Sequence, residues 1–102
     1  MATILLRGVD LFFRGKFDAM FGAAHSVVTR SETTPDLVVA DVGEVDPVEL
    51  VRSYPGTPIL GYTQHTNTDG LRRARAAGIQ RVVARSVIAE RGATIVDELL
   101  SV

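Results

Sequence analysis

Cysteine is absent from the 102 residues, which excludes disulfide bonds, thiol catalysis and thiolate metal sites. The two histidines, His25 and His65, stand far apart in the chain and make no recognisable metal-binding spacing. No apolar run approaches the ~18 residues that a membrane span needs. The first residues also lack the charged and apolar regions of a signal peptide. These absences predict a soluble cytoplasmic domain without membrane contact.

A basic excess is also missing, since eleven Lys and Arg face twelve Asp and Glu, for a net charge of −1. Nucleic-acid-binding proteins usually carry a clear basic surplus, so we expect no direct nucleic-acid binding. The length allows one domain over residues 1–102. The apolar share of 46% is enough to build a single core.

Short apolar runs alternate with amphipathic segments, a pattern that predicts an open parallel α/β sheet of about five strands, doubly wound with helices on both faces. Strands are expected at residues 3–6, 37–42, 58–62 and 81–84, with a weaker candidate at 26–29. Helices are expected to begin after Asp10, Asp46 and Asn67 or Thr68, and a last helix packs through Ile88, Ile95 and Leu99. Central strands are predicted to carry Leu5, Val39, Leu60 and Val83, and buried helix positions are predicted at Phe12, Phe13, Phe17, Phe21, Val48, Leu50 and Val51.

One helix is missing from this alternation. Only residues 31–36 separate the second candidate strand from the third, whereas a parallel crossover normally needs a dozen or more residues. The second helix is therefore predicted to be absent or collapsed. Segment 22–36 is expected either to form an irregular loop or to contain a strand of different direction. The sheet face left uncovered near the first two strands would favour self-association or a protein partner.

Three strings resemble the receiver domain of response regulators, the CheY-like fold: PDLVVADV (35–42), TPILGYT (57–63) and ARAAGIQRVVARS (74–86). Their order covers almost the whole chain. The resemblance implies that Asp41 stands where receivers accept phosphate and that Thr63 stands where a hydroxyl senses it. It further implies a role in two-component signal transduction.

Departures from the receiver pattern surround the implied phosphorylation site. Receivers hold Mg²⁺ with an acidic pair after the first strand, but this stretch reads Arg7-Gly8-Val9-Asp10, so Asp10 is the one acid there. The receiver lysine is replaced by Arg85. Because Mg²⁺ requires several oxygen ligands, we expect Mg²⁺ binding to be lost and no other cofactor. The planar guanidinium of Arg85 is expected to grip Asp41 by two hydrogen bonds.

The sequence therefore predicts a degenerate pseudo-receiver, not an enzyme, which signals by contact with a protein partner or with a second copy. The expected interaction surface is basic: Arg72, Arg73, Arg75, Arg81 and Arg91. A solvated helix face without function explains the same arginines. Two other functions stay open: a receiver weakly phosphorylated at Asp41, and a small ligand-binding or enzymatic domain that uses the loops at the strand ends. In the enzymatic alternative, His65 would reach Asp41 over the carboxyl-terminal edge of the sheet and act as a general base, although an exposed loop histidine is the simpler interpretation.

Overall fold

The computed structural model describes residues 1–101 as a five-stranded parallel sheet with four helices. The strands are β1 (Thr3–Arg7), β2 (Ser26–Val28), β3 (Leu37–Asp41), β4 (Ile59–Thr63) and β5 (Arg81–Ala84). The helices are α1 (Leu11–Phe21), α2 (Pro47–Ser53), α3 (Thr68–Ala76) and α4 (Arg85–Leu100). The strand order is β2-β1-β3-β4-β5, and every neighbouring pair is parallel. The predicted doubly wound α/β fold is confirmed.

Three helices begin at side chains that accept a backbone N–H, as the sequence predicts. Asp10 Oδ1 accepts from Phe13 N at 2.8 Å, and Asp46 Oδ1 accepts from Val48 N at 3.0 Å. Asn67, and not Thr68, caps α3 by accepting from Gly70 N at 3.0 Å. Each cap satisfies a donor that the first helical turn leaves unpaired.

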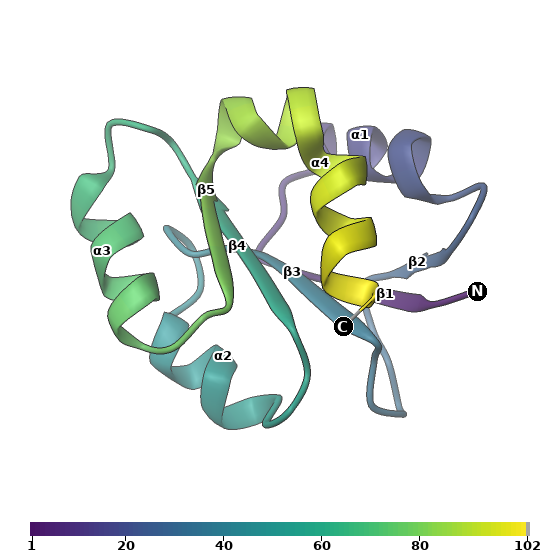
Figure 1. Cartoon of the computed structure of the whole chain (residues 1–102), viewed down its shortest axis with the longest axis horizontal. Helices are drawn as coiled ribbons and strands as arrows, with labels where there is room; N and C mark the ends of the chain where they lie inside the picture. Colours follow the sequence, from purple (N-terminus) through teal and green to yellow (C-terminus); the bar gives the residue numbers. More distant parts are fainter. Residues whose placement is uncertain (102) are drawn as a thin grey trace.

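Helices cover both faces of the sheet (Figure 1), and an apolar layer lies on each face. On one face, α1 and α4 cover the aromatic cluster of Phe13, Phe17, Phe21 and Tyr62. On the other face, α2 and α3 pack against Val38, Ala40 and Ile59. Strands β3 and β4 are buried at every position, as expected for the centre of a parallel sheet.

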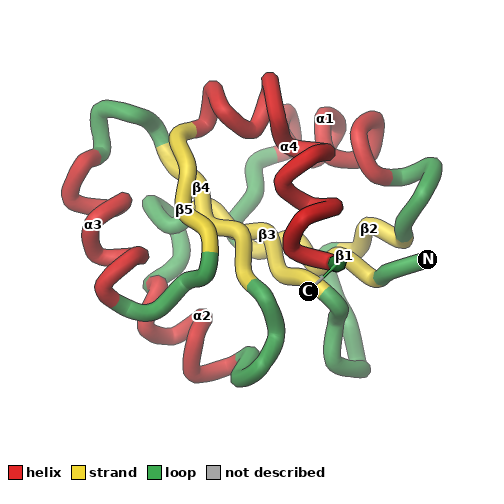
Figure 2. The backbone as a smooth tube through the Cα atoms, viewed as in Figure 1, coloured by secondary structure: helices red, strands yellow, loops and turns green. Residues whose placement is uncertain are grey.

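The predicted loss of a helix between β2 and β3 is confirmed, because segment 29–36 carries none (Figure 2). The expectation of a different strand direction is wrong, since β2 pairs with β1 in parallel. This short connection is possible because β2 has only three residues, so the chain has little length to return along.

The apolar area expected to be exposed beside the missing helix is covered. Leu5, on β1, is 3% exposed, and Tyr54 and Val51 pack against its cluster. An uncovered sheet face is therefore no longer a reason for self-association.

Three predicted positions are corrected. Val83 lies on β5, which is an edge strand and not a central one. Phe12 is 73% exposed, because the buried stripe of α1 repeats every fourth residue and Phe12 lies one position beside it. Val48 is 50% exposed, since α2 turns Pro47 and Leu50 inward instead.

None of the helices in residues 1–101 is long and apolar enough to cross a membrane.

Candidate functional site

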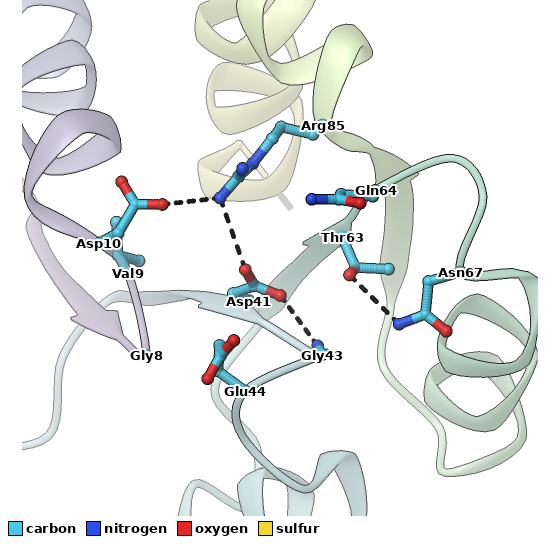
Figure 3. A pocket seen from close by; sticks show the side chains of 10 residues that line it. All are labelled: Gly8, Val9, Asp10, Asp41, Gly43, Glu44, Thr63, Gln64, Asn67 and Arg85. Carbon is cyan, nitrogen blue, oxygen red and sulfur yellow. Dashed lines mark hydrogen bonds and ion pairs between the residues drawn. The ribbon is translucent and has the colours of Figure 1, made fainter.

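An open pocket of about 760 Å³ lies at the carboxyl ends of β1, β3 and β4 (Figure 3). We call it the remnant pocket. The four site residues predicted from the sequence all line it: Asp10, Asp41, Thr63 and Arg85. The other lining residues are Gly8, Val9, Gly43, Glu44, Gln64 and Asn67. Of these, Gly43, Glu44, Gln64 and Asn67 were not predicted, although each follows a buried strand by one to four residues, where parallel strands bring their loops together.

Arg85 lies between two carboxylates. Its Nη2 donates to Asp10 Oδ2 at 2.8 Å and lies 3.7 Å from Asp41 Oδ2, an ion pair without a hydrogen bond (Figure 3). The expected grip on Asp41 by two hydrogen bonds is therefore wrong. One reason is that the guanidinium also stacks on Phe13, with 4.5 Å from Cζ to the ring centroid. This stacking and the hydrogen bond to Asp10 together fix the orientation of the Arg85 guanidinium.

Asp41 is almost completely buried at the end of β3. Its Oδ1 accepts from Gly43 N at 2.9 Å, so the second oxygen is the one that faces Arg85. A Cβ on Gly43 would lie 2.8 Å from Thr63 Oγ1, which explains why this turn requires glycine. On the far side, Asn67 Nδ2 donates to Thr63 Oγ1 at 3.4 Å. Both receiver-like groups therefore have partners within the protein.

Two ionisable groups near Arg85 are shifted. The hydrogen bond from Phe13 N lowers the pKa of Asp10, and the positive charge of Arg85 lowers it further. Burial raises the pKa of Tyr62 above its usual range, and the negative charge of Asp41 adds to this. The Tyr62 hydroxyl is buried and has no hydrogen-bond partner in residues 1–101.

The pocket does not fit Mg²⁺. Asp10, Asp41 and Glu44 line it, but no three His, Asp or Glu side chains among residues 1–101 are grouped so that they could hold one metal ion. After β1, Gly8 supplies no side chain, and Arg7 donates instead to the hydroxyl of Tyr54. The one acid after β1, Asp10, accepts a hydrogen bond from Arg85. The guanidinium therefore occupies the place beside the carboxylates that a divalent ion would take.

The predicted basic surface is distributed over α3, β5 and α4. Three of its arginines pair with carboxylates: Arg72 with Asp69, Arg73 with Asp46 at 4.0 Å, and Arg81 with Glu98 at 3.2 Å. Within the described residues, Arg75 and Arg91 form no such pair and are exposed. His65 lies outside the remnant pocket and lines a neighbouring one.

Solved structures with the same fold include response regulators. NtrX from Brucella abortus superposes with a TM-score of 0.82 at 16% identity, over 98% of this chain and 27% of that chain. The chemotaxis protein CheY4 of Vibrio cholerae gives a TM-score of 0.76 at 19% identity, over 97% of this chain and 98% of that chain. The receiver domain of the response regulator TorR gives 0.81 at 16%, over 99% and 98%.

No protein-family model matches the sequence, and no curated protein matches it either. The likeness therefore rests on the arrangement of the strands and helices, since the sequence identity to these neighbours is only 16% to 19%. This chain has the parallel strand order β2-β1-β3-β4-β5 with four helices, and the neighbours superpose on nearly all of it. The chain has the fold of a response-regulator receiver domain.

Proposed function

We propose that this chain is a receiver-like signalling module that acts by protein–protein contact, without phosphoryl transfer to Asp41. The observation that carries the proposal is the position of Arg85 Nη2 between the carboxylates of Asp10 and Asp41. The receiver fold supports the signalling role, and the altered site supports the loss of phosphorylation.

Phosphoryl transfer to a carboxylate requires neutralisation of the charge that develops on the phosphate oxygens. In receivers a divalent ion does this, but here the stretch after β1 offers Gly8 where a ligand is needed. Arg85 supplies one positive charge, and that charge is already paired. A phosphoryl group at Asp41 would have to displace this guanidinium and would then face Asp10 and Glu44 as well, which line the same pocket.

For the contact surface we propose the basic residues of α3, β5 and α4, with Arg75 and Arg91 as the positions that contact a carboxylate-bearing protein. Both are exposed and are not paired with an acid of residues 1–101. An arginine that lacks an internal partner retains its full capacity to form bidentate bonds with a carboxylate. We further propose that the module is not an enzyme.

The decisive experiment is incubation of the protein with Mg²⁺ and acetyl phosphate, followed by intact-mass measurement. The mass is expected to stay unchanged. Asp41→Asn is the control, because it keeps the shape of the side chain and removes the acceptor. A gain of one phosphoryl group that is lost in Asp41→Asn would overturn the proposal and restore a phosphorylated receiver.

The contact surface is tested separately. Arg75→Glu and Arg91→Glu should each abolish co-purification of the partner from the native host, or dissociate a dimer in light scattering. The matched control is Arg52→Glu, an exposed arginine on α2, which should change neither. Equal loss in all three variants would indicate a general charge effect and contradict the proposed surface.

A further inference from the structure

A second pocket opens beside the remnant pocket, between α1, the start of α4 and the loop that follows β4. We call it the side pocket. Its volume of about 500 Å³ lies within the range of small-molecule sites. Its lining residues are Phe13, Lys16, Gln64, His65, Thr66, Arg85, Ser86 and Ala89. Gln64 and Arg85 line both pockets, so the two cavities share a wall.

The charges of the two pockets differ. Three carboxylates line the remnant pocket, whereas the side pocket has two cations, Lys16 and Arg85, and no Asp or Glu in its lining. In the part of the chain that the structure describes, no carboxylate lies within ion-pair distance of Lys16. A pocket with two cations and no acid favours a negatively charged ligand.

The side pocket is also lined by flat apolar surface. Phe13 contributes its ring, with the Arg85 guanidinium 4.5 Å from the ring centroid and the Lys16 ammonium 5.7 Å from it. Ala89 adds a small apolar side chain from α4. Phe13 is only 4% exposed and the Arg85 guanidinium covers its ring, so a planar ring would pack against the edge of this stack and against Ala89.

Hydrogen-bond capacity remains at this wall. The Nε of Arg85 has no hydrogen-bond partner in residues 1–101, although it is buried. Helix α4 begins at Arg85 without a side-chain cap and without an acid in its first turn, which adds to the positive potential there. The donors, the cations and the flat wall together define one class of ligand.

We propose that the side pocket binds a small aromatic carboxylate, with its ring against Ala89 and the edge of the Arg85–Phe13 stack and its carboxylate between Lys16 and Arg85. The inference goes beyond the proposed function, because it assigns a ligand to a cavity outside the remnant pocket. Since Arg85 lines both cavities, the ligand competes with Asp10 and Asp41 for the same guanidinium. Ligand binding thereby changes the ion pairs of the remnant pocket, in place of the phosphorylation that we propose is lost.

The experiment is a titration of the full chain with 2-naphthoate, followed by backbone amide chemical shifts. Saturable shifts are expected at Phe13, Lys16 and Ser86. Lys16→Gln should weaken binding about tenfold, the size of one lost charged contact. Its matched control is Arg14→Gln on the same helix, which removes an exposed cation outside the side pocket and should leave the affinity unchanged.

Three further measurements sharpen the test. Uncharged 2-naphthamide should bind about tenfold more weakly than 2-naphthoate, because the carboxylate contacts are absent. Ala89→Trp should abolish binding, because the larger side chain fills the side pocket. Ala89 is exposed, so the variant protein should still fold. Asp10→Asn should tighten binding, since it releases Arg85 while Asn still caps α1.

The proposal is overturned if 2-naphthoate does not bind, if the amide binds as well, or if Arg14→Gln weakens binding as much as Lys16→Gln. Shifts confined to Gly43 and Asn67 would place the ligand in the remnant pocket and overturn it as well. None of these outcomes depends on whether Asp41 accepts phosphate, so the two proposals fail separately.

Discussion

Arg7 Nη1 donates a hydrogen bond of 2.7 Å to the hydroxyl of Tyr54, and its guanidinium lies 5.9 Å from the centroid of that ring. The pair joins the end of β1 to Tyr54, the residue that ends α2. It lies on the sheet face that the absent helix between β2 and β3 would otherwise cover. Leu5 lies in the cluster that Tyr54 covers. Arg7 also lies in the stretch where receivers carry acids. It therefore offers no carboxylate to a metal ion, and its side chain instead holds Tyr54 over the sheet.

Tyr54→Phe should therefore destabilise the fold by about 1 kcal/mol, because it removes one hydrogen bond to a charged donor at a half-buried site. Arg7→Met should have a similar effect, and the double variant should cost less than the sum of the two. Urea unfolding of the four proteins measures this coupling. Strictly additive effects would show that the two side chains do not stabilise one another.

Restoring the receiver acid at Gly8 should fail. Gly8 has a φ of +67°, and a Cβ there would lie 2.6 Å from Val45 Cγ2. Gly8→Asp is expected to cost about 2 kcal/mol or more from backbone strain and this contact.

Gly56 provides the matched control, since its φ is +78° but a Cβ there would meet no atom within 4 Å. Gly56→Ala should show the backbone cost alone, about 1 kcal/mol. Gly8→Ala should cost more, and Val45→Ala should restore part of the difference. Equal losses of Tm at the two glycines would contradict the steric argument.

Most of the fold could be predicted from the sequence because its signals are local. Asp10, Asp46 and Asn67 each cap the helix that follows within three residues, and the apolar runs of β3 and β4 are buried on both faces. The absence of a helix between β2 and β3 could also be predicted locally, because the number of residues in a connection limits how far it can reach.

Contacts between distant residues could not be predicted in the same way. The resemblance to receivers predicts Arg85 near Asp41. The position of Arg85 Nη2 between two carboxylates also depends on Asp10, which is 75 residues away, and on the ring of Phe13. The covering of the sheet by Arg7 and Tyr54 joins residues 47 apart. Neither separation leaves a periodic pattern in the chain, so only the folded geometry reveals these pairs.

The charge of Asp10 should make stability depend on pH in acid. Its pKa is lowered from about 3.8 in the folded protein, so its contribution is fully present above that value and is lost as the pH falls through the lower folded pKa. Asp10→Asn keeps the cap and removes the charge. The Tm of the natural protein should exceed that of Asp10→Asn at pH 6, and the difference should shrink below pH 4. An equal difference at pH 3 and pH 6 would show that the charge is not responsible.

Tyr62→Phe should stabilise the protein, in contrast to Tyr54→Phe. The Tyr62 side chain is 0% exposed, and its hydroxyl has no hydrogen-bond partner within the described chain. Removing an unpaired buried hydroxyl relieves a desolvation cost, so a gain of about 1 kcal/mol at neutral pH is expected, or about 4–8 °C in Tm.

The same substitution predicts an alkaline effect. Because burial raises the pKa of Tyr62, the folded protein keeps its phenol protonated while the unfolded chain ionises it near pH 10. The natural protein therefore loses stability as the pH rises above 10, through a proton that the unfolded state releases. Tyr62→Phe lacks this proton, so its advantage in Tm should increase between pH 10 and pH 11. A Tyr62→Phe variant less stable than the natural protein at pH 7 would mean that the hydroxyl has a partner in solution, with Arg85 beside it as the first candidate.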